Sequence, residues 1–131
     1  MIQRVQSIFL ILATISIIVI VFMFPILINN DNMPTSAFDI SSIRWLLTIS
    51  AGLSLFAFFQ YKNIKRQQFL SRLSRFIITI TLVLIVFVYK NEANVIGSGF
   101  FLLIIPFVLL IGANYFLAKD EKLIKAADRL R

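Results

Sequence analysis

The acidic and nucleophilic side chains decide which chemistry this chain could do, and they are few. The sequence has six carboxylates, no cysteine and no histidine. This excludes thiolate nucleophiles, imidazole bases, axial histidine ligation of haem, and Cys/His sites for zinc or iron–sulfur clusters. Asp31 and Asp39 could bind a cation, but two carboxylates eight residues apart in a loop are weak support for a metal site. We therefore expect no catalytic residue, no metal, no cofactor, and a protein that is not an enzyme.

Basic side chains form the most charged parts of the chain. Five lie between two apolar stretches and five in the last segment. Nine of these ten are candidate interaction residues: Lys62, Lys65, Arg66, Arg72, Arg75, Lys122, Lys125, Arg129 and Arg131. They could contact anionic lipid headgroups, RNA or an acidic partner, or they could only hold their segments on one side of a membrane. Aromatic residues should interleave a run that binds nucleic acid, and only Phe69 does so. Nucleic acid is therefore not favoured as a partner, and the topological role is the simpler interpretation.

Small and polar residues within the apolar stretches are candidates for helix packing. Ser50, Ser54 and Ala57 are spaced i, i+4 and i+7, so they share one helix face. Small residues let helix backbones approach closely in lipid. Asn114 carries a side-chain amide that requires a hydrogen-bond partner in an apolar setting. The face could pack within the chain or against another subunit, and spacing alone does not separate these alternatives.

Four uncharged apolar stretches must position all of these residues. Hydrophobic residues make up 60% of the 131-residue chain, and a helix needs about 20 of them to cross a bilayer core of about 30 Å. We predict an all-α membrane protein, a single four-transmembrane-helix bundle over residues 1–131 with spans at 6–27, 43–61, 70–90 and 98–118. No charged residue lies in the interior of an apolar stretch, which argues against proton relays and ion-coupled transport.

Proline, glycine and arginine residues set the expected helix ends. We predict that the first helix continues to Leu27, because Pro25 near its outer end removes a hydrogen bond of little value there. The third helix should begin near Phe69, and the fourth near Ser98 after a break at Gly97. Pro106 should kink the fourth helix, because it cannot donate a hydrogen bond to Leu102.

The distribution of charge predicts the orientation. The N-terminus, the loop of residues 62–75 and the segment after residue 118 carry eleven of the 13 basic residues. With four spans, these three segments lie on one side of the membrane, and the positive-inside rule makes that side the cytoplasm. We expect a multi-pass protein with both termini cytoplasmic, in contact with a bilayer that has anionic headgroups.

The last segment, residues 119–131, has the pattern of a short amphipathic helix. Leu123, Ala127 and Leu130 are spaced i, i+4 and i+7 on one face, and Glu121 with Lys125 forms a favourable i, i+4 pair. We predict a short cytoplasmic C-terminal helix that extends past the membrane and lies on lipid or on a neighbouring protein.

Both ends of the sequence carry a family resemblance. The start, residues 1–8 (MIQRVQSI), and the finish, residues 120–131 (DEKLIKAADRLR), resemble the domain-of-unknown-function family four-two-nine-three, small four-span membrane proteins of Bacteroidota. The layout is similar over the whole chain, but only the ends are specific. The resemblance implies four spans and a bacterial inner membrane, and it implies no catalytic activity.

These observations favour a non-catalytic function. We expect an accessory or scaffolding subunit of a larger inner-membrane complex, with other integral membrane proteins as partners. The alternative is a small transporter or pore that acts as a homo-oligomer, which would need a continuous polar stripe across two helices. Helix residues Thr48, Ser50 and Ser54 offer half of such a stripe. The sequence leaves open the stoichiometry, the partner and whether Pro106 acts as a hinge.

Overall fold

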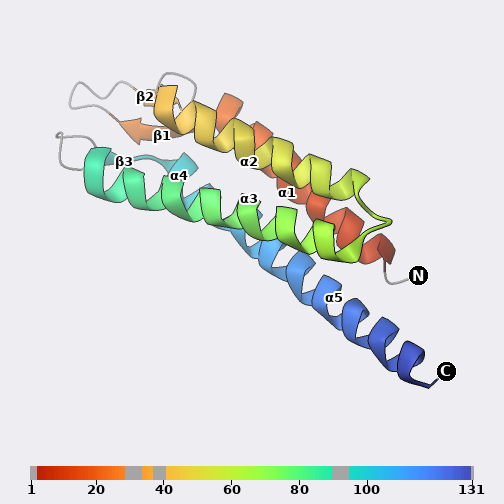
Figure 1. Cartoon of the computed structure of the whole chain (residues 1–131). Coiled ribbons are helices and arrows are strands. Elements are labelled where there is room, and N and C mark those ends of the chain that lie inside the picture. Colours follow the sequence, from red (N-terminus) through yellow and green to blue (C-terminus); the bar gives the residue numbers. More distant parts are fainter. Residues whose placement is uncertain (1–2, 29–33, 37–40, 90–94, 131) are drawn as a thin grey trace.

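Four long apolar helices dominate the computed structural model, which describes residues 3–28, 34–36, 41–89 and 95–130 (Figure 1). In chain order the helices are α1 (Gln3–Met23), α2 (Ser41–Phe59), α3 (Ile64–Leu84), α4 (Ser98–Leu102) and α5 (Ile104–Arg129). One π-helical turn, η1 (Ile85–Tyr89), continues α3. Four helical segments are long and apolar enough to cross a membrane: Val5–Met23, Ser41–Phe59, Ile64–Phe87 and Ser98–Arg129. The prediction of four such helices is confirmed.

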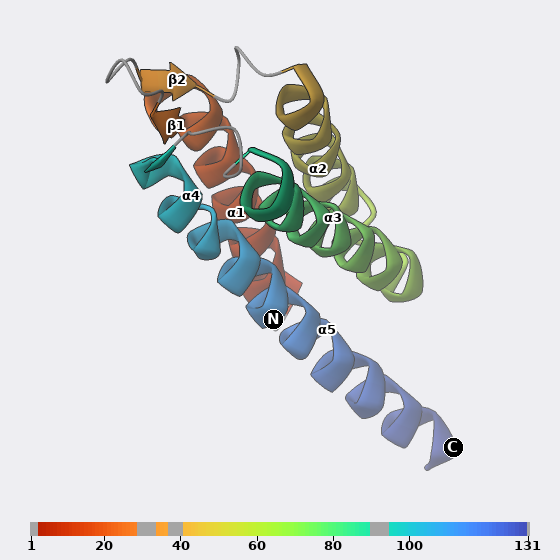
Figure 2. The same ribbon diagram turned by 90° about the vertical axis from the view of Figure 1, so that its left-hand side faces the viewer.

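The helices pack side by side in a closed ring. α1 contacts α2, α2 contacts α3, α3 contacts α5, and α5 returns to contact α1. Consecutive long helices run in opposite directions, and Figure 2 shows α4 and α5 alongside α1, with α3 alongside α2. This is the up-down-up-down arrangement of a four-helix bundle.

Each helix turns one regular stripe of residues towards the centre of the bundle. Buried positions alternate at three and four residues, a spacing that keeps two nearly parallel helices in contact along their length. The stripes are Gln6, Leu10, Ala13, Ile17 and Ile20 in α1; Ile43, Leu47, Ser50, Ser54 and Ala57 in α2; Gln67, Ser71, Ser74, Ile78 and Thr81 in α3; and Pro106, Leu110, Ala113, Leu117 and Asp120 in α5. Large apolar side chains such as Phe22, Phe76 and Phe101 remain exposed on the outside, as expected for a surface covered by lipid.

A small antiparallel sheet lies at the end of the bundle opposite the two chain termini (Figure 1). It joins β1 (Pro25–Ile28), β2 (Pro34–Ser36) and β3 (Val95–Ile96) in the order β2-β1-β3. The prediction that the first helix continues to Leu27 is therefore wrong, because α1 ends at Met23. Proline disfavours a helical conformation in the residue before it, so the chain leaves the helix at Phe24 and becomes extended at Pro25.

Two glycines allow the fourth apolar stretch to approach β1 closely. The Gly97 N–H donates a 2.7 Å hydrogen bond to the Ile26 carbonyl. A Cβ atom added at Gly97 would lie 2.5 Å from the Pro25 carbonyl oxygen, and one added at Gly99 would lie 2.9 Å from the same atom. No other residue type fits this contact without moving the backbone.

The last two helices meet at an interruption one turn before Pro106. α4 ends at Leu102 and α5 begins at Ile104, with Leu103 in a turn between them. Pro106 has no N–H to donate to the Leu102 carbonyl, so the regular hydrogen-bond ladder cannot continue through this turn. Pro106 is itself buried.

The third helix begins earlier than the sequence predicted. α3 starts at Ile64 rather than near Phe69, so the basic segment between the second and third apolar stretches is largely helical. Gln67, Gln68 and Ser71 are buried on its inner face, while Arg72 is exposed on its outer face. The buried stripe of α3 therefore continues from the apolar stretch into the basic segment, and the basic side chains lie on the outer face of the helix.

Candidate functional site

The predicted small-residue face of α2 lies inside the bundle. Ser50, Ser54 and Ala57 are all buried. The Ser50 and Ser74 hydroxyls are 2.8 Å apart, and the Ser74 hydroxyl also donates to the Ser50 carbonyl at 2.9 Å. The Ser54 hydroxyl lies 2.7 Å from that of Thr14 in α1. Ser50, Ser54 and Ala57 thus pack α2 against neighbouring helices of the same chain.

A group of buried polar side chains occupies the end of the bundle near the termini. The Gln6 amide of α1 donates to the Asp120 carboxylate and, at 3.3 Å, to the Phe116 carbonyl of α5. Gln68 and Ser71 of α3 are also buried. The Gln68 Nε2, the Ser71 Oγ and one Asp120 carboxylate oxygen are buried without a hydrogen bond from the described residues.

Asn114, predicted to bond between helices, has both side-chain polar atoms buried and without a hydrogen-bond partner in the described part of the chain. Gln6, Gln68, Ser71 and Asp120 were not predicted as buried polar residues: Gln6 and Ser71 lie at the very ends of predicted spans, and Gln68 and Asp120 lie in segments predicted to be a cytoplasmic loop and tail. The signal that could have found them is the three-and-four spacing, which continues from the apolar stretch through Ser71 to Gln67.

Four of the predicted interaction residues gather around one cleft. Lys62, Lys65 and Arg66, at the start of α3 and just before it, face Lys125 of α5 across a space of about 500 Å³. We call this space the basic cleft. Glu121 and Asp128 also line it, so cations outnumber carboxylates there.

The other predicted interaction residues that the structure describes do not line the basic cleft. Arg72, Lys122 and Arg129 are exposed, and Arg75 is half-buried. Arg131 lies outside the described residues, as do Asp31 and Asp39. Among the described residues there is no group of three or more His, Cys, Asp or Glu side chains that could hold a metal ion.

Glu121 links the basic cleft to the C-terminal helix. Its carboxylate lies 3.0 Å from the Lys125 ammonium. The hydrogen bond from Lys125 is the main cause that lowers the pKa of Glu121 below its ordinary value of 4.5. The carboxylate therefore stays charged at neutral pH and neutralises part of the cleft.

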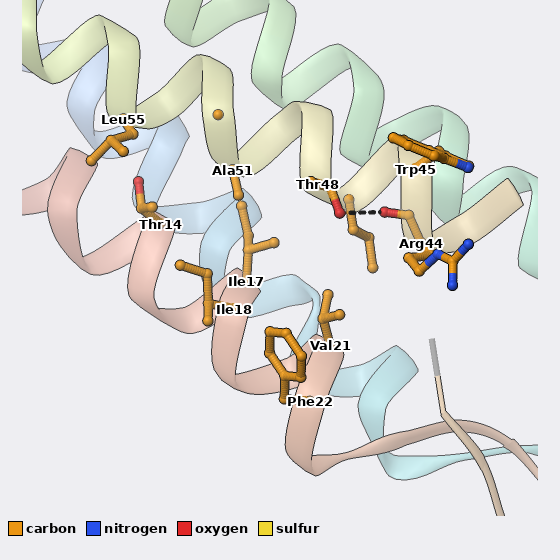
Figure 3. A pocket seen from close by; sticks show the side chains of 12 residues that line it. Thr14, Ile17, Ile18, Val21, Phe22, Arg44, Trp45, Thr48, Ala51 and Leu55 are labelled. Carbon is orange, nitrogen blue, oxygen red and sulfur yellow. Dashed lines mark hydrogen bonds between the residues drawn. The ribbon is translucent and has the colours of Figure 1, made fainter. Parts of the chain in front are cut away.

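A second space, the α1–α2 groove, lies near the sheet end of the molecule (Figure 3). Its volume is about 610 Å³, and residues 14–22 of α1 and 44–55 of α2 supply its walls. Ile17, Ile18, Val21 and Leu55 make these walls mostly apolar. Arg44 is the one charged residue among its lining side chains, and its guanidinium lies 6.0 Å from the centre of the Trp45 ring. No pattern in the sequence predicted this groove.

A family model matches almost the whole chain. The model of a family described as Domain of unknown function (DUF4293) matches residues 2–130 of the chain, and this confirms the resemblance carried by the two ends. No curated protein and no solved structure matches the chain.

Proposed function

The chain belongs to the DUF4293 family, and we propose that it is a non-catalytic accessory or scaffolding subunit of a larger complex in the bacterial inner membrane. In this proposal the four apolar helices span the bilayer. The loop between α2 and α3 and both chain termini lie in the cytoplasm, because the basic residues concentrate there. The sheet of β1, β2 and β3 lies on the outer side.

The observation that carries this proposal is the length of α5. The helix continues without interruption to Arg129 and projects past the ends of α1 and α3 (Figure 1). We call residues 119–129 of this helix the C-terminal arm. Residues 122–129 are exposed, including Leu123 and Ile124, which are 51% and 47% accessible. Burying such side chains against a second surface is favourable at about 25 cal/mol per Å² of apolar area.

The arm combines these apolar side chains with cations, which suits two kinds of surface. One is a helix or groove of a partner protein, and the other is an anionic membrane surface. We favour a protein partner because the arm leaves the bundle as a rigid continuation of α5. A helix that only lies on the membrane surface needs a bend where it leaves its span.

The experiment that tests this proposal is extraction of the full-length chain from its native membrane in mild detergent, followed by mass spectrometry of co-migrating proteins. We expect at least one stoichiometric integral membrane partner. The double variant Leu123→Gln/Ile124→Gln should lose that partner. Ala126→Gln, which adds the same polar side chain to an exposed position of the arm, should keep it. A monomer or homo-oligomer without a partner would contradict the proposal.

The alternative, a homo-oligomeric pore or transporter, gains no support from the polar side chains of α2. Ser50 and Ser54 bond to neighbouring helices, and the Thr48 hydroxyl donates to the Arg44 carbonyl of its own helix at 2.7 Å. The Ser50 and Ser54 hydroxyls are therefore used in helix packing, and the Thr48 hydroxyl is satisfied within its own helix. Solute flux into vesicles that contain the purified chain would restore this alternative.

A further inference from the structure

We propose that the start of α3 binds one anionic phospholipid, with the headgroup phosphate at Lys65 and Arg66 and the first part of an acyl chain in a neighbouring apolar pocket. This inference rests on the membrane placement of the helices proposed above, and it needs no partner for the C-terminal arm. Three observations carry it: an apolar pocket beside the basic cleft, two cations shared by both spaces, and the spacing of charge and apolar groups along α3.

The apolar pocket lies between the end of α2 and the start of α3, and we call it the α2–α3 pocket. Its volume is about 430 Å³. The turn that joins its two walls lies at the end of the bundle with the two termini (Figure 1). In this turn the Gln60 N–H donates to the Phe56 carbonyl at 3.2 Å, and the Asn63 N–H donates to the Gln60 carbonyl at 3.0 Å. One continuous helix–turn–helix segment therefore supplies all of the lining residues: Phe56, Gln60, Lys65, Arg66, Phe69 and Leu70.

The cations of the pocket lie one helical turn from its apolar residues. Lys65 and Phe69 are spaced i, i+4, and so are Arg66 and Leu70, so each cation shares a helix face with an apolar side chain. Lys65, Arg66 and Phe69 are exposed, and Leu70 is half-buried. A ligand in this place meets positive charge at one end and apolar groups at the other. The ligand that fits is therefore an amphipathic anion.

The same two cations join the pocket to the basic cleft. Lys65 and Arg66 line both spaces, so the apolar space and the charged space meet at their side chains. Glu121, one of the carboxylates of the cleft, is paired with Lys125 at 3.0 Å. Within the described part of the chain, neither Lys65 nor Arg66 forms an ion pair. Ammonium and guanidinium groups bind phosphate oxygens through charge-assisted hydrogen bonds, so this junction suits the phosphate of a lipid headgroup.

The spacing of these groups along α3 matches the interfacial layer of a bilayer. This layer is roughly 5–8 Å thick on each side, since a bilayer of about 40–45 Å has a hydrocarbon core of about 30 Å. Lys65 and Phe69 are about 6 Å apart along the helix axis. Phe69 and Tyr61 are 63% and 52% exposed, and exposed aromatic side chains favour the interface. A phosphate at Lys65 therefore places the start of its acyl chain at the level of Phe69.

The walls and the volume of the pocket favour a lipid over an acidic segment of a partner protein. Phe56 and Phe69 are exposed on the outer surface of the bundle, where bilayer lipid surrounds the proposed spans. Sites for small ligands have volumes of about 300–1,000 Å³, and the pocket is within this range. A partner helix is about 10–12 Å wide with its side chains, so it would rest on the rim of the pocket and leave the interior empty.

The experiment places a tryptophan in the wall of the pocket. Trp45 is the single tryptophan of the chain, so the variant Trp45→Phe/Phe69→Trp carries one fluorescent reporter, at position 69. This full-length variant is reconstituted in phosphatidylcholine vesicles with a minor fraction of lipid whose brominated acyl chains quench tryptophan fluorescence. We expect brominated phosphatidylglycerol to quench the reporter with an apparent affinity about tenfold higher than brominated phosphatidylcholine, a preference of the size expected for two cations near anionic lipid.

Two double variants in the reporter background remove the same charge from different places. Lys65→Gln/Arg66→Gln removes the cations of the pocket and should reduce the preference below about twofold. Arg72→Gln/Lys122→Gln removes two exposed cations that line neither the pocket nor the basic cleft, and it should keep the tenfold preference. Glycerol phosphate at millimolar concentration should not relieve the quenching, because it has no acyl chain. Circular dichroism verifies that each variant is folded.

Four results would overturn the proposal. Equal quenching by both lipids would mean that the reporter meets only bulk lipid. Loss of the preference in Arg72→Gln/Lys122→Gln would assign it to the charge of the whole surface. Relief of quenching by glycerol phosphate would make the site one for a soluble anion. Protection of the reporter from both brominated lipids would mean that a protein segment covers the pocket.

Flotation of the vesicles separates this proposal from the proposed function. A chain that floats with the vesicles but shows no lipid preference contradicts the lipid site alone. A chain that does not float contradicts the membrane placement as well.

Discussion

At the scale of single residues, the most informative contact joins Ser50 and Ser74. The two hydroxyls are 2.8 Å apart, and each also lies within hydrogen-bond distance of the other residue's carbonyl, at 2.9 and 3.1 Å. This reciprocal arrangement holds the backbones of α2 and α3 close together. Only a small hydroxyl residue can satisfy all of these atoms in so narrow a space.

The pair should therefore stabilise the bundle cooperatively. In a double-mutant cycle of Ser50→Ala and Ser74→Ala, we expect a coupling free energy of about 0.6 kcal/mol and at most about 1.7, the range of hydrogen bonds between membrane helices. Reversible unfolding in mixed micelles measures it. Ser50→Ala combined with Thr79→Ala is the control, because Thr79 is exposed and bonds to its own helix at Arg75. A coupling equal to that of the control would show that the serines pack only by size.

At the scale of elements, the contact between β1 and the start of α4 closes the sheet end of the bundle. β1 pairs with β2 on one edge and with β3 on the other, in the register Leu27 with Ile96. The residues that follow β3 must then pass close to the backbone of Pro25 and Ile26, where only glycine fits. This connection links the segment after α1 to the segment before α4.

Gly97→Ala should destabilise the protein by about 1–3 kcal/mol, the usual cost of forcing extra atoms into a packed site. The added methyl group would lie 2.5 Å from the Pro25 carbonyl oxygen, which belongs to backbone and cannot rotate away. Gly52→Ala is the matched control and should leave the free energy of unfolding nearly unchanged or raise it slightly, since it enters open space within a helix. Unfolding of both variants in the same detergent measures the difference. Equal stability of the two would contradict the close approach.

The long helices could be predicted from the sequence, and the sheet could not. Runs of about 20 apolar residues have few alternatives to a membrane-spanning helix, so the existence of the four helices followed from composition alone. The strands are two to four residues long, and their pairing depends on contacts between residues far apart in the chain. Pro25 was the available signal, since the residue before a proline favours an extended conformation.

The candidate site was predictable in part for a similar reason. The basic cleft is formed by two segments that only the folded bundle brings together. Lys62, Lys65 and Arg66 come from one segment and Lys125 comes from the other. The α1–α2 groove arises where Gly52 and the neighbouring side chains leave space between two helices. A composition of apolar residues predicts that helices pack, but the places where they fail to fill the space depend on the exact crossing of the two helices.

At the scale of the whole molecule, the two ends of the helix bundle differ in charge and in shape. The sheet and the α1–α2 groove lie at one end, and the basic cleft, the buried polar group around Asp120 and the C-terminal arm lie at the other. Every helix in the ring contacts its neighbours along a continuous stripe, so the two ends belong to the same helix bundle. The proposed orientation therefore assigns each end to one side of the membrane.

Site-directed labelling should detect that orientation. Because the sequence has no cysteine, each single-cysteine variant carries one reactive thiol at a known position. Lys65→Cys and Lys122→Cys should react with a membrane-impermeant maleimide only after the cells are opened, because the proposed orientation places their segments in the cytoplasm. Ser42→Cys, at the exposed start of α2, should react in intact cells. The opposite pattern would reverse the assignment of every loop.

The pairing of β1 with β3 also dictates an order of assembly. Leu27 leaves the ribosome well before Ile96, and chains are made at about 5–20 residues per second, so β1 waits several seconds while α2 and α3 are synthesised. During that interval one edge of β1 has no backbone partner and is open to pairing with another chain. Synthesis of β3, which directly precedes α4, ends this exposure. The segment before α4 thus covers the edge that the end of α1 leaves open.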